Sequence, residues 1–77
     1  MIAELDDVIL EHDLPVHGLA RGDIGTVVLV HANGAGYEVE FTALDGETLA
    51  VVTLNADEVR SVGRREIAHV RALTQVA

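Results

Sequence analysis

The 77-residue sequence predicts an all-β fold, a small five-stranded barrel. β-branched and apolar residues gather in five short runs, which is the pattern of strands. The pairs Asn33-Gly34 and Asp45-Gly46 join three of these runs, and both pairs are strong hairpin signals. One long loop, with the only proline, follows the first run. A sheet of this size is expected to bend around one core, because a flat one would leave its edges exposed.

The first strand is predicted over residues 5–11, and the loop after it carries most of the turn chemistry. Pro15 supplies no N–H for a sheet and ends the strand. We expect the ring of His17 to bond a loop carbonyl, Asp23 to accept loop N–H groups, and Gly25 to permit a bulge or bend in the next strand. The structural residues of this motif are Pro15, His17, Gly18, Gly22, Asp23 and Gly25.

The remaining strands are predicted over residues 24–31, 37–42, 48–54 and 59–62. The third of the five alternates cleanly between apolar and polar residues. A strand turns successive side chains to opposite faces, so Tyr37, Val39 and Phe41 are expected to face the core. Glu38 and Glu40 are then expected to face solvent. Residues 55–58 make a tight connection, for which we expect one 3₁₀ turn.

The last fifteen residues differ from the body, which divides the chain into a barrel over residues 1–62 and a basic, apolar tail over residues 63–77. In the tail, Ile67, Val70 and Leu73 recur at three-residue spacing, which predicts a short C-terminal helix or extension. A helix this short is marginal by itself. Three outcomes therefore stay open: docking on its own barrel, packing on a partner or second copy, or fraying.

Charge is distributed unevenly along the chain. Residues 1–59 carry twelve acidic side chains against Arg21 alone, a net charge of −11, whereas residues 60–77 carry four arginines and Glu66, a net charge of +3. An acidic body repels phosphate backbones and attracts basic proteins, so we expect a protein partner, and a homodimer through the tail, in preference to nucleic acid. The residues expected to bind a partner are Glu38, Glu40, Arg64, Arg65 and Arg71.

Residue types argue against catalysis and cofactors. The chain has no cysteine and no lysine, and its four histidines stand in no known ligand motif, so we expect no metal, no cofactor and no phosphate-binding loop. Paired carboxylates such as Glu38 and Glu40 perform acid–base chemistry only in a pocket that separates their pKa values. The acidic N-terminus is unlike a signal peptide, and no apolar run reaches about 18 residues. We therefore predict a non-enzymatic cytoplasmic protein without a membrane segment.

Two motifs carry a resemblance to a known family. Residues 14–19 read Leu-Pro-Val-His-Gly-Leu, and residues 22–28 read Gly-Asp-Ile-Gly-Thr-Val-Val. With the strands around them, they resemble an uncharacterised bacterial family, a domain of unknown function whose members look like small stand-alone SH3-like barrels. The resemblance covers residues 5–62 and leaves out the tail. Residues 22–28 by themselves also resemble the KOW motif of ribosomal and transcription-factor barrels, although the usual flanking basic residues are absent.

Two functions follow from these observations. The first is a small protein-interaction module, antitoxin- or immunity-like in its most concrete form, whose acidic face meets a basic partner. The alternative is a KOW-like, RNA-associated barrel that would contact phosphates through Arg60 and the tail arginines, Arg64, Arg65 and Arg71.

Overall fold

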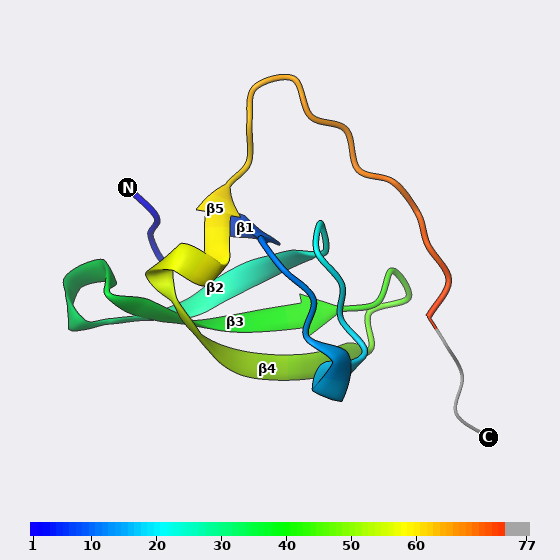
Figure 1. Ribbon diagram of the computed structural model, residues 1–77, viewed down its shortest axis with the longest axis horizontal. Coiled ribbons are helices and arrows are strands. Elements are labelled where there is room, and N and C mark those ends of the chain that lie inside the picture. The colour runs from blue at the N-terminus through cyan, green and yellow to red at the C-terminus, as the bar shows by residue number, and fades with distance from the viewer. Residues whose placement is uncertain (74–77) are drawn as a thin grey trace.

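The computed structural model describes residues 1–73, and their fold is a single curled antiparallel sheet (Figure 1). Three 3₁₀ turns, η1 (Pro15–His17), η2 (Ala32–Gly34) and η3 (Ala56–Glu58), stand between strands. The strands are β1 (Asp7–Leu10), β2 (Ile24–His31), β3 (Gly36–Thr42), β4 (Thr48–Asn55) and β5 (Val59–Ser61). Their order across the sheet is β4-β3-β2-β1-β5. The predicted all-β, barrel-like fold is confirmed.

The strand bounds agree closely with those expected from the sequence. β2 spans the predicted residues, and β4 and β5 each differ from expectation by one residue. β1 is shorter than predicted at both ends, because Leu5 has a φ of 72° and belongs to a turn, and because the chain bends at Glu11. The Leu5 N–H nevertheless donates to the Val27 carbonyl at 2.7 Å, and this bond holds the residues before β1 against β2.

The hydrophobic core lies inside the curl of the sheet. Tyr37, Val39 and Phe41 of β3 are all buried, which confirms the predicted alternation along this strand. The loop after β1 adds Leu19, so it takes part in the core as well as connecting strands. The complete cluster is Val8, Leu10, Leu19, Val27, Tyr37, Val39, Phe41, Leu54 and Val59. Every member lies between residues 8 and 59, so the tail contributes nothing to it.

Of the two features that Gly25 was expected to permit, a bulge and a bend, the bulge is wrong, because the irregularity in β2 lies between Val27 and Leu29. The bend stays a prediction. Gly25 is buried and lies against β3, where an added Cβ would stand 2.5 Å from Val39 Cγ1 and 2.8 Å from Phe41 Cε1. Only a residue without a side chain allows β2 to approach the core this closely.

The turn η3 joins β4 to β5, as the tight connection predicted. Its hydrogen bonds are those of a capping box: the Asn55 N–H donates to Glu58 Oε1 at 2.8 Å, and the Asn55 side chain in turn accepts from the Glu58 backbone. His12 Nε2 lies 3.0 Å from Glu58 Oε2, which ties the segment after β1 to the same turn. η3 thereby positions β5 for pairing with β1.

The helix predicted in the tail does not form over residues 63–73, and residues 74–77 lie outside the described part of the chain. The alternative prediction, an extension, is what the described residues show. After β5 the chain leaves the sheet in a wide arc without helix or strand and comes down beside the β3–β4 hairpin (Figure 1). Ile67, Val70 and Leu73 are all exposed, so no burial of an apolar stripe stabilises a helix here.

Candidate functional site

The outer face of the sheet carries the two acidic residues singled out in the sequence. Glu38 and Glu40 project from β3, in the middle of the three-stranded part formed by β2, β3 and β4. Glu38 pairs with Leu29 of β2 and Thr53 of β4, and Glu40 pairs with Thr26 and Val51. Directly paired residues share one face of a sheet. We call this surface, with Leu29, Glu38, Glu40, Val51 and Thr53, the acidic face.

Hydrogen bonds hold both carboxylates of the acidic face in place. Glu38 Oε2 accepts from Thr53 Oγ1 at 2.6 Å and lies 2.7 Å from His31 Nε2, while Glu40 Oε2 accepts from Thr48 Oγ1 at 2.9 Å. The bonds from Thr53 and His31 lower the pKa of Glu38 below its ordinary value. Among residues 1–73 no side chain or N–H donates to Oε1 of either glutamate. Each carboxylate thus keeps one oxygen for a donor from outside.

Apolar side chains flank these carboxylates. Leu29 is 44% exposed on the β2 side and Val51 is 53% exposed on the β4 side. The acidic face therefore combines fixed negative charge with exposed apolar area. The arrangement suits a partner that presents both cationic and apolar side chains.

Arg60 of β5 and Arg71 of the tail each pair with a carboxylate of the chain itself. Arg60 forms a bidentate pair with Glu66, at 2.8 Å from Nη1 to Oε1 and 2.6 Å from Nη2 to Oε2, and its Nε lies 3.4 Å from Glu11 Oε1. The Gly63 N–H also donates to Glu66 Oε1. The bonds from Arg60 and then Gly63 lower the pKa of Glu66 to about 2. The turn over residues 60–66 is therefore held by charge-assisted hydrogen bonds.

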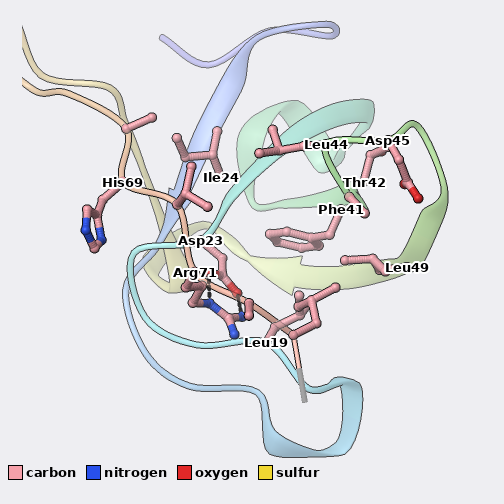
Figure 2. Close-up of a pocket in the computed structure, with 15 residues that line it drawn as sticks. Leu19, Asp23, Ile24, Phe41, Thr42, Leu44, Asp45, Leu49, His69 and Arg71 are labelled. Carbon is pink, nitrogen blue, oxygen red and sulfur yellow. Dashed lines mark hydrogen bonds and ion pairs between the residues drawn. The ribbon is translucent and has the colours of Figure 1, made fainter. Parts of the chain in front are cut away.

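Arg71 makes the second pairing, with Asp23 at the start of β2 (Figure 2). Its Nε donates to Asp23 Oδ1 at 2.9 Å, its Nη2 donates to Asp23 Oδ2, and Nη2 also lies 3.3 Å from the Gly18 carbonyl oxygen. Partial burial raises the pKa of Asp23, but the hydrogen bonds from Arg71 and from the Ala20 N–H outweigh it and leave the pKa below its ordinary value. Arg64 and Arg65 are exposed and form no ion pair within residues 1–73.

The motif loop is built largely as the sequence predicts. Pro15 opens η1, Gly18 ends it with a φ of 68°, and Gly22 turns the chain with a φ of 94°. Asp23 accepts a loop N–H, from Ala20 at 2.8 Å, as predicted. The role predicted for the His17 ring is wrong within the described residues: its backbone N–H, not its imidazole, donates to the loop, to the Leu14 carbonyl at 3.0 Å. The hydrogen bonds of a 3₁₀ turn come from the backbone alone, so the turn does not need a bond from the exposed imidazole ring.

The histidines are not gathered into one site. His12 lies beside Glu58 and His31 beside Glu38, on separate parts of the barrel. Among residues 1–73 no group of three or more His, Asp or Glu side chains stands close enough to hold a metal ion. No helix within these residues is long and apolar enough to cross a membrane.

These features define a small five-stranded all-β domain with an added tail. The pattern of a family described as a domain of unknown function (DUF4926) matches residues 4–61, the whole of the barrel, and the chain belongs to this family. The predicted resemblance to an uncharacterised family is thereby confirmed, while the likeness to SH3-like and KOW barrels stays a prediction. No match was found among curated proteins or among solved structures.

The sequence predicted the acidic face but not the partners of the arginines. Arg71 lies 48 residues from Asp23 in the chain, and no spacing rule links them. The tertiary fold brings the tail back to the loop, so only the folded structure reveals this pairing.

Proposed function

We propose that the protein is a small non-catalytic interaction module whose acidic face binds a basic, partly apolar surface of another protein. The observation that carries the proposal is the pair Glu38 and Glu40, fixed by hydrogen bonds at Oε2 and open at Oε1, between exposed Leu29 and Val51. Side chains that are already ordered lose little conformational entropy when a partner binds.

An antitoxin- or immunity-like role in the bacterial cytoplasm is the form of this function that we propose. In such a role a small acidic protein covers a basic functional surface of another protein, and the net charge of −8 suits it. Long-range attraction between opposite charges would speed the encounter and weaken as salt rises.

The tail arginines support an RNA-associated role less well. That function needs free cations to replace counterions on phosphates. Arg60 is paired with Glu66 and Glu11, and Arg71 is paired with Asp23, which leaves Arg64 and Arg65 without an ion pair in the described part of the chain. We therefore favour the protein-interaction module.

Affinity capture from host cells tests the proposal when charge-matched variants are compared. The test variant is E38Q/E40Q, which keeps an oxygen to accept the threonine bonds. The control is E4Q/D57N, which removes the same two charges from exposed positions outside the acidic face. We expect a protein captured by the wild type and by the control to be lost, or its Kd to rise about tenfold or more, with E38Q/E40Q. Equal capture by both variants contradicts the proposal.

A further inference from the structure

The loop that ends in Asp23 is a receptor for a guanidinium group. Asp23 presents both carboxylate oxygens to Arg71, and the Gly18 carbonyl gives a third acceptor to the same group. Forked recognition of this kind selects arginine over lysine, because two parallel N–H groups match two carboxylate oxygens. The Ala20 N–H holds the Asp23 carboxylate in place.

The receptor is formed by the barrel without help from the tail. Gly18 and Gly22 have their positive φ values inside the loop, and Leu14 and Leu19 bridge each other, with N–H to carbonyl distances of 2.9 and 3.1 Å. All of these residues fall within the family match at residues 4–61, whereas Arg71 falls outside it. The acceptor thus lies inside the part of the chain that the family model matches, and the arginine that fills it lies outside that part.

An apolar groove continues from the guanidinium receptor towards the β3–β4 hairpin. A cavity of about 600 Å³ lies between the barrel and residues 68–73. Its barrel side is mostly apolar, with Leu19, Ile24, Phe41, Leu44 and Leu49, and it also includes Thr42 and Asp45. Figure 2 shows these residues around the cavity, with the Asp23–Arg71 pair at one side. A mostly apolar lining with a few polar groups is the usual composition of a binding site.

The tail fills this groove poorly. Val70 is 72% exposed and Leu73 is 37% exposed, although both line the groove. A second cavity, of about 360 Å³, stands on the β1 and β5 side of the tail. Over residues 67–73 the ion pair with Asp23 is the main attachment, so the tail is an exchangeable occupant.

From this geometry we infer that the groove beside Asp23 binds an extended, arginine-bearing apolar segment of a partner protein, and that residues 68–73 occupy it in cis when no partner is bound. The occupant seen in the structure defines the chemistry: an arginine flanked by aliphatic residues, as in Val70-Arg71-Ala72-Leu73. The charge of −11 over residues 1–59 attracts such a cationic segment. The inference goes beyond the proposed function, because this groove shares no residue with the acidic face.

A labelled peptide with the sequence of residues 66–73 tests the inference by fluorescence anisotropy against full-length variants. R71A removes the cis occupant and leaves the core intact. R65A is the matched control, since it removes an arginine of the tail that has no ion pair within residues 1–73. A site blocked in cis shows a Kd raised in proportion to its blocked fraction. We expect R71A to bind the peptide about tenfold more tightly than the wild type or R65A do.

Two further variants separate specific binding from general attraction. D23N/R71A is expected to lose the peptide, and a peptide with alanine in place of arginine is expected to bind R71A about tenfold more weakly. Amide shifts in NMR spectra should fall on residues 18–24 and 41–49. Equal binding by R71A and R65A, or shifts confined to the acidic face, overturns the inference. A wild-type dimer in sedimentation that R71A does not form also overturns it, because the occupant is then the tail of a second copy.

Discussion

Different forces stabilise the barrel and hold the tail against it. The barrel is held by nine buried apolar side chains and by ladders between neighbouring strands. Residues 62–73 add no buried side chain and hold to the barrel through ion pairs at Arg60 and Arg71. Apolar burial is cooperative and little affected by salt, whereas exposed ion pairs contribute about 0–1 kcal/mol each and are screened. The tail is therefore expected to detach under conditions that leave the barrel folded.

The largest expected effect is on the barrel, from the substitution F41A. Phe41 is 1% exposed in the middle of the core, so its removal leaves a cavity and is expected to cost about 3–5 kcal/mol of unfolding free energy. A domain of this length has about 4–12 kcal/mol in all. Urea denaturation followed by circular dichroism measures the loss. L44A is the control, because Leu44 is 91% exposed, and it is expected to change stability by less than about 0.5 kcal/mol. Similar losses for both variants would contradict the assignment of the core.

An intermediate effect is expected from G25A, at the close approach of β2 to β3. The new methyl group would stand 2.5 Å from Val39 Cγ1, so the core must shift, at a cost of about 1–3 kcal/mol. V28A, on the same strand but partly exposed, serves as the control and should cost less. If G25A is as stable as the wild type, the packing of Gly25 against β3 is wrong.

The smallest effect on global stability is expected when acid protonates Glu66 and breaks its ion pair with Arg60, which holds the turn over residues 60–66. The pKa of Glu66 is lowered from 4.5 to about 2, so its pairing with Arg60 is fully present above pH 4.5 and is lost as the pH falls towards 2. Carboxyl ¹³C shifts measured by NMR report this titration directly. In R60A the pKa of Glu66 should return towards 4.5, while the melting temperature changes little. A wild-type Glu66 that titrates near 4.5 would show that the turn is not held by this pair.

Most of the barrel could be predicted from the sequence because its signals are local. Alternation along β3 assigned Tyr37, Val39 and Phe41 to the core, and the pairs Asn33-Gly34 and Asp45-Gly46 located the hairpins. Each depends on residues at most a few positions apart. The acidic face followed from the same alternation, since Glu38 and Glu40 must lie opposite the core.

The role of Gly25 and the state of the tail could not be predicted in this way. A glycine in a strand is compatible with a bulge or with a close approach, and only the position of Val39 decides between them. Three-residue spacing of Ile67, Val70 and Leu73 describes a helix that forms only if something buries it. Over residues 63–73 nothing does.

The sequence by itself thus determined the class of fold, the strand bounds to within a few residues, the turns of the motif loop and the acidic face. Only the tertiary structure decided that Asp23 meets Arg71, that Arg60 meets Glu66, and that an apolar groove lies beneath the tail. The physical reason is the range of the interactions. Strand and turn preferences act between neighbours in the chain, whereas the guanidinium receptor and its groove join residues that only the curled sheet brings together.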